Sequence, residues 1–144
     1  MRKLTAIRTA IATIAMLAGS AAVWAEDLPP HDAWQEVIST QIVAFRDGDA
    51  PTAFRYAGAG FQQSFPNPRY FLHAIIASGY APIILSKDHS FGTFAVQDDG
   101  MVVQVVEFIG PRQEMFRALY RVVEEKDGWR VQGVMLGMIS GVKI

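Results

Sequence analysis

The sequence predicts an α+β fold in which three N-terminal helices pack on a curved antiparallel sheet. Apolar residues recur at helical spacing in the first half of the chain, whereas after Pro82 short apolar runs are separated by turn residues at 98–100, 110–112 and 126–128. These strands follow one another without an intervening helix. Neighbouring strands should therefore be antiparallel, and the helices should cover one face of the sheet.

Composition limits the size and chemistry of the domain. The chain has 144 residues, of which 51% are hydrophobic and 19% charged, so one packed domain is expected. The net charge is -1 and no run of Lys or Arg exceeds two, which argues against a nucleic-acid partner. The absence of cysteine excludes disulfides, thiolate zinc sites and cysteine nucleophiles.

The first 25 residues have the pattern of a signal peptide. Three basic residues lie within Met1–Arg8, an apolar stretch follows from Thr9 to Ala18, and Val23-Trp24-Ala25 has the small final residue of a cleavage site. We expect cleavage after Ala25, export to the periplasm or beyond, and a single mature domain over 26–144 without a membrane span. The alternative is an uncleaved membrane anchor, since Thr9 to Ala25 is nearly long enough to cross a bilayer.

Three helices are expected in the first half. The first starts at Asp32, stops at Gly48, and carries its apolar stripe at Trp34, Val37, Ile38, Ile42 and Phe45. The second covers 50–57 behind a cap at Asp49. The third runs from Pro68 to Ser78 behind a cap at Asn67 and stops at Gly79. The segment Ala57 to Gly60 is expected to be a helix end.

Strands are expected near 83–87, 91–97, 101–109, 115–126 and 129–139, and two turns define their register. A two-residue turn at Asp127-Gly128 places Lys126 opposite Trp129 and Glu125 near Arg130. A five-residue loop from Gly110 to Glu114 places Ile109 opposite Met115 and Glu107 opposite Arg117. Both registers pair opposite charges across strands, which favours them.

The registers divide the last three strands into an inner face toward the helices and an outer face. The inner face should carry Val102, Gln104, Val106, Phe108, Phe116, Ala118, Tyr120, Val122, Trp129, Val131, Gly133 and Met135. The outer face should mix charged Glu107, Arg117, Arg121 and Arg130 with apolar Val105, Leu119, Val123, Val134, Leu136 and Met138. An apolar patch of that extent predicts a homodimer through the outer face, unless residues 141–144 or a loop cover it.

Five short motifs of apolar and turn residues cover nearly the whole mature chain. They are Gln41-x-x-Ala44-Phe45-x-x-Gly48-Asp49, Ala53-Phe54-x-Tyr56-Ala57, Phe65-x-x-Pro68-x-x-Phe71, Gly79-Tyr80-x-Pro82 and Gly128-Trp129-Arg130-Val131-x-Gly133. They resemble the bacterial family called domain of unknown function 4864, and the element order resembles the nuclear transport factor 2-like cone. The resemblance implies a fold and no particular activity. Val134 stands where cysteine is common in that family, so any thiol chemistry of relatives is absent here.

No catalytic or metal-binding pattern stands out. His31, His73 and His89 are far apart in sequence, and none has a second ligand at helical spacing, so neither a metal nor a cofactor is expected. His73 as a general base is a weaker interpretation than a histidine on a helix flank. Asp98-Asp99 is better explained by the turn at Gly100 than by an acid and base pair.

The polar residues of the inner face are the candidate site. Gln104 and Tyr120 lie opposite each other, with Met135 and Trp129 on the neighbouring strand and Tyr56 and Tyr80 from the helical side. One interpretation is a hydrogen bond between Gln104 and Tyr120 that seals the core. The other is a pair of polar anchors in an apolar cavity beside Gly133, closed by Phe54, Tyr56 and Ile76.

Two function classes follow. The favoured one is an exported, non-catalytic module that binds a small apolar ligand or a partner through the cone. The alternative is an enzyme of isomerase or dehydratase type that uses the inner-face Tyr and Gln with a nearby acid or histidine.

Overall fold

The computed structural model describes residues 30–138, which form an α+β domain. The helical elements are α1 (His31–Arg46), α2 (Ala50–Arg55), α3 (Ala59–Ser64), α4 (Pro68–Ile75), a π-helical turn η2 (Ile76–Tyr80) and α5 (Ala81–Leu85). The strands β1 (Asp88–Val96), β2 (Val102–Ile109), β3 (Met115–Glu125) and β4 (Gly128–Met138) form an antiparallel sheet in that order. The signal peptide predicted for residues 1–25 lies outside the described residues.

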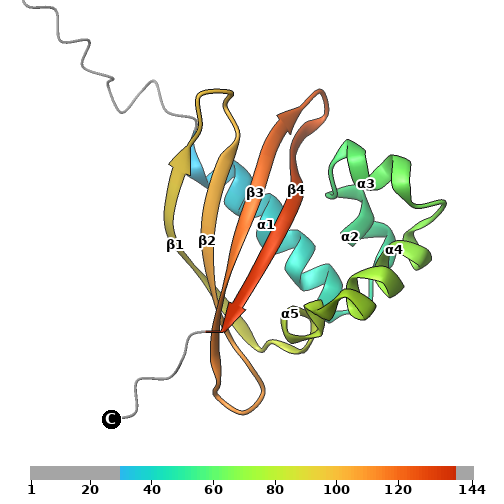
Figure 1. Cartoon of the computed structure of the whole chain (residues 1–144), viewed down its shortest axis with the longest axis vertical. Helices are drawn as coiled ribbons and strands as arrows, with labels where there is room; N and C mark the ends of the chain where they lie inside the picture. The colour runs from blue at the N-terminus through green and yellow to red at the C-terminus, as the bar shows by residue number, and fades with distance from the viewer. Residues whose placement is uncertain (1–29, 139–144) are drawn as a thin grey trace, which may run out of the picture.

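The helix α1 crosses one face of the sheet, and the shorter helices gather beside β4 (Figure 1). The apolar side chains of α1 pack on the inner face of the sheet and form one core cluster. This cluster includes Trp34, Ile38, Ile42, Val106, Phe108, Tyr120, Val122 and Val131. The shorter helices build a second cluster with the far end of α1, made of Ala44, Phe45, Ala53, Ala57 and Phe71. The domain therefore has two neighbouring cores.

Two of the predicted caps are confirmed. Asp49 Oδ1 accepts the backbone N–H of Thr52, and Asn67 Oδ1 accepts that of Tyr70. The start of α1 differs from the prediction, because the helix begins at His31 behind Pro30 with no side-chain cap. A short polar cap residue is thus not what sets this end of the helix.

The sequence predictions for two segments are wrong. Residues 83–87 were expected to be a strand, but Ala81–Leu85 is the helix α5, because Pro82 stands in its first turn and Ile83 is buried. Residues 57–60 were expected only to end a helix, but Gly58 is the N-cap of α3. The backbone at Gly58 passes so close to Val131 that a Cβ would lie 3.3 Å from the Val131 carbonyl oxygen.

The predicted register of β2 and β3 is confirmed over its whole length. Gln104 pairs with Tyr120, Glu107 with Arg117 and Ile109 with Met115. The Arg117 and Glu107 side chains form an ion pair with an N–O distance of 2.7 Å. Alternate residues of both strands are buried beneath α1, as the inner face predicted.

The register between β3 and β4 differs from the prediction in two places, the first at the turn. Glu125 pairs with Gly128, so the two-residue turn consists of Lys126 and Asp127, and the predicted Lys126–Trp129 and Glu125–Arg130 pairings are wrong. A shift of two residues leaves the faces unchanged, and Trp129 and Val131 are buried as expected.

The second difference is a β-bulge at Gln132. After it, the side chains of β4 lie on the opposite face of the sheet from the one predicted. Val122 pairs with Val131 but Arg121 pairs with Gly133, so Gln132 is an extra residue. Beyond it, Val134 and Leu136 pack on the core, and Met135 lies opposite Leu119 with 66% of its surface exposed. The prediction that placed Met135 inside and Val134 and Leu136 outside is therefore wrong.

The described helices are all too short or too polar to cross a membrane.

Candidate functional site

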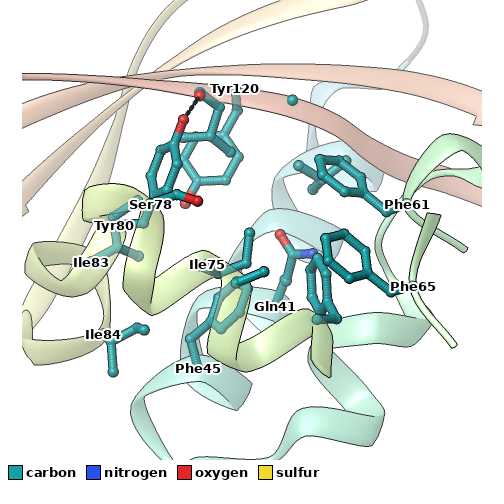
Figure 2. A pocket seen from close by; sticks show the side chains of 15 residues that line it. Gln41, Phe45, Phe61, Phe65, Ile75, Ser78, Tyr80, Ile83, Ile84 and Tyr120 are labelled. Atoms are coloured by element: carbon teal, nitrogen blue, oxygen red, sulfur yellow. Dashed lines mark hydrogen bonds between the residues drawn. The ribbon is translucent and has the colours of Figure 1, made fainter. Parts of the chain in front are cut away.

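An apolar cavity of about 260 Å³ lies where the two core clusters face each other. Its walls come from α1, from the helices α3 to α5 and from β3 and β4 (Figure 2). Its lining residues are Gln41, Phe45, Phe61, Phe65, Phe71, Ala74, Ile75, Ser78, Tyr80, Ile83, Ile84, Tyr120, Val131, Gly133 and Val134. Most of this wall is aromatic or aliphatic, which is typical of a small-molecule site.

The helical wall owes its shape to a break in the helix after α4. Gly79 has φ 93° and ψ 12°, which is left-handed backbone that glycine adopts readily. The chain leaves η2 at this point and turns into α5, so Tyr80 and Ile83 can both face the cavity. Ser78, just before the break, also lines the cavity and is exposed to solvent. The break thus brings residues on both sides of Gly79 to the cavity wall.

Two tyrosines enter the cavity from opposite layers and differ in how their hydroxyls are used. The Tyr80 hydroxyl donates to the carbonyl oxygen of Val134 at 2.7 Å, which ties η2 to β4. Tyr120 is only 1% exposed, and no hydrogen bond within residues 30–138 uses its hydroxyl. Figure 2 shows the two side chains next to each other below the sheet. Burial raises the pKa of Tyr120, so its hydroxyl stays protonated and can donate.

Gln41 contributes a second buried polar group from α1. Its Nε2 donates to the carbonyl oxygen of Ala53 at 3.0 Å, and the side chain is 2% exposed. A carbonyl oxygen can only accept, so this bond fixes which end of the amide is the nitrogen. The amide oxygen then points toward the interior of the cavity, as Figure 2 shows. It offers an acceptor that no described donor occupies.

A cluster around the Arg46 guanidinium lies behind the lining. Arg46 donates to Ser86 Oγ from Nε at 3.1 Å and from Nη2 at 3.0 Å, and Nη2 also reaches His89 Nδ1 at 3.1 Å. Since a guanidinium can only donate, Nδ1 accepts and the His89 proton is on Nε2, which donates to Ser39 Oγ at 2.8 Å. Burial and Arg46 both lower the pKa of His89, which keeps the ring neutral. These groups hold α1 against β1 and do not line the cavity.

Gln104 lies elsewhere on the inner face, where its side chain bonds to both α1 and β1. It is fully buried, and its Oε1 accepts from Trp34 Nε1 at 3.0 Å and from Gln35 Nε2 at 3.1 Å. Its Nε2 lies 2.9 Å from the Gly92 carbonyl oxygen and 3.2 Å from that of Thr93. A β-bulge between Phe91 and Phe94 leaves these carbonyls free. Gln104 therefore does not bond to Tyr120, and both alternatives for the pair need revision.

Of the other predicted site residues, some line the cavity and some lie outside it. Tyr80 lines the cavity with Tyr120, whereas Trp129 packs on the Trp34 ring at 5.3 Å and Tyr56 lies under the Arg130 guanidinium at 5.5 Å. Met135 is on the outer face. The structure thus brings two of the six candidate residues to the cavity.

The helical side of the cavity also differs from the prediction. Phe54, Tyr56 and Ile76 were expected to close it, but Phe45, Phe61, Phe65, Phe71 and Ile75 do so. Gln41 was missed as a polar group of the site. Its signal in the sequence is a lone amide in the otherwise apolar stripe of α1, between Ile38 and Phe45.

His73, the weaker candidate base, is exposed on α4. Asp99 caps its own turn by accepting the backbone N–H of Met101 at 3.0 Å, in line with the turn interpretation. Among residues 30–138, no three His, Asp or Glu side chains come together in a way that could hold a metal ion.

Comparison with known families gives a match over most of the chain. The family Domain of unknown function (DUF4864) matches residues 29–143. The chain belongs to this family. Neither the comparison with curated proteins nor that with solved structures found a match. The membership that the motifs predicted is confirmed, and it assigns no activity.

Proposed function

We propose that this DUF4864 domain binds a small, largely apolar molecule in the cavity between its two cores. The observation that carries the proposal is the separation of the two clusters. Tyr120 and Val131 belong to one, Phe45 and Phe71 to the other, and all four line the same cavity. Protein interiors are ordinarily close-packed, so a bound molecule that filled this space would join the two cores.

The groups in the wall are suited to binding. Aromatic and aliphatic side chains supply contact area, and Tyr120 and Gln41 supply two unoccupied hydrogen-bonding atoms. The isomerase or dehydratase alternative needs a base within hydrogen-bond reach of the substrate. The described lining holds no Asp, Glu or His, and the ring nitrogens of His89 are engaged by Ser39 and Arg46. Binding is therefore the function that this geometry supports best.

We also propose that the domain is a nuclear transport factor 2-like cone and that it is exported. Supporting the cone, α1 lies across the inner face of an antiparallel sheet whose strands β1 and β4 each carry a bulge, the device that bends a sheet. Supporting export, residues 1–25 have the basic start, apolar stretch and Val-x-Ala ending of a signal peptide. A ligand-binding role outside the cytoplasm is consistent with both.

Toluene is a suitable first probe, because an engineered apolar cavity of about 150 Å³ holds benzene. We expect titration calorimetry to detect toluene binding and a saturating dose to raise the melting temperature. Ala74→Leu adds three carbons to the wall and should weaken toluene binding without loss of stability, since it fills part of the empty space. Ala77→Leu, on an exposed residue outside the lining, is the matched control and should bind as the wild type does. Absence of both heat and thermal shift with wild-type protein would refute the proposal.

A further inference from the structure

The polar atoms of the cavity restrict the ligand to one chemical class. We infer that the molecule is uncharged and carries a hydroxyl, or a neutral group that both donates and accepts, which Tyr120 and Gln41 hold together. This inference rests on the proposed function and deepens it. Two observations carry it: the Tyr120 hydroxyl and the Gln41 amide oxygen are both free to bond, and the described lining carries no charge.

The two free atoms need different partners. The Tyr120 hydroxyl is a donor, because burial raises the pKa of its side chain and keeps the proton in place. The Gln41 oxygen is an acceptor, because the bond from Nε2 to the Ala53 carbonyl turns the oxygen inward. A hydroxyl can accept from the first and donate to the second, whereas a ketone or ether can only accept and would leave the Gln41 oxygen without a donor.

The absence of charge in the described lining excludes ions from this class. None of the described residues that line the cavity carries a formal charge. A carboxylate would lose its hydration in exchange for one phenolic hydrogen bond, and an ammonium would find no counter-charge. The Arg46 guanidinium lies behind the wall, where it is bonded to Ser86 and His89, and it does not line the cavity. The described lining itself is therefore uncharged.

Tyr56 provides a matched control for the role of the Tyr120 hydroxyl. It is a tyrosine outside the lining and lies under the Arg130 guanidinium. Tyr80 is unsuitable, because it lines the cavity and its hydroxyl occupies the carbonyl oxygen of Val134, another lining residue. Tyr120→Phe and Tyr56→Phe each keep the ring, so the two variants differ only in which hydroxyl is lost.

Three probes of one shape test the class: toluene, p-cresol and p-toluate, each titrated calorimetrically into the full protein at pH 7. We expect p-cresol to bind about tenfold more tightly than toluene, the ratio supplied by a net hydrogen bond at the upper end of the usual range, and p-toluate not to bind. Tyr120→Phe should reduce the p-cresol to toluene ratio toward one. Tyr56→Phe, outside the lining, should keep the wild-type ratio.

The outcomes separate this inference from the proposed function. If toluene binds and p-cresol binds no better, or p-toluate binds as well as p-cresol, the neutral hydroxyl class is wrong and the apolar site stands. If none of the three binds, the proposed function itself fails. Should Tyr120→Phe not fold, Gln41→Met gives the second test, because it removes the acceptor at similar volume and should also reduce the ratio. A ratio unchanged in both Tyr120→Phe and Gln41→Met would overturn the inference.

Discussion

Replacement of Gln104 by leucine tests whether this amide fastens α1 to the sheet. The change leaves the Trp34 indole N–H, which is fully buried, without its acceptor at 3.0 Å. An orphaned buried donor costs about 1–3 kcal/mol, and the lost bonds to the Gly92 and Thr93 carbonyls add about 1 kcal/mol, because these exposed residues can turn to water. We expect the free energy of unfolding to fall by about 2–4 kcal/mol in urea denaturation followed by far-UV circular dichroism.

Two comparisons show whether the lost free energy of unfolding comes from the hydrogen bonds of Gln104. Gln97→Leu makes the same chemical change at an exposed turn position and should alter stability by less than about 0.5 kcal/mol. In a W34F background the indole donor is already gone, so Gln104→Leu should cost about 1–2 kcal/mol less than in the wild type. A Gln104→Leu variant as stable as Gln97→Leu, or a cost that is the same in both backgrounds, would refute this account of α1.

Three further predictions concern other parts of the molecule. Burial and Arg46 lower the pKa of His89 in the folded protein, so its contribution to stability is complete above the unfolded pKa of about 6.5 and is lost as pH falls from that value through the lower folded pKa. His89→Gln should flatten this part of the stability curve in urea titrations at pH 5–8. The mature protein should begin at Glu26, and an intact mass of the exported form that still includes Trp24 would contradict cleavage. Leu119 is 36% exposed opposite Met135 on the outer face, so Leu119→Glu should convert a dimer to a monomer in sedimentation velocity, and a wild type that is monomeric at high concentration would contradict the dimer.

The parts of the fold that the sequence predicted well are those defined by local rules. The caps at Asp49 and Asn67 depend on one short polar side chain each, and both form. The five-residue loop after Ile109 fixed the register of β2 and β3, so the inward positions of Gln104 and Tyr120 followed directly. Loop length and side-chain alternation suffice for such features.

The parts that it did not predict depend on contacts distant in sequence. The apolar run at 83–85 fits a buried strand as well as a helix, and only the packing of Ile83 on the core decides between them. Gln104 was correctly placed inside, but its partners Trp34 and Gln35 lie 70 and 69 residues away in sequence. Gln41 was missed because its bond to Ala53 depends on how α2 folds back on α1.

The extra residue at Gln132 has a consequence for alignments of related chains. Before it, odd-numbered positions of β4 face inward, and after it even-numbered positions do. A relative that lacks one residue here would have a regular strand, and its counterparts of Val134 and Leu136 would still face inward. Alignment columns on either side of position 132 should therefore alternate between apolar and variable residues in opposite phase, and a gap at this column would mark relatives that build the same wall without the bulge.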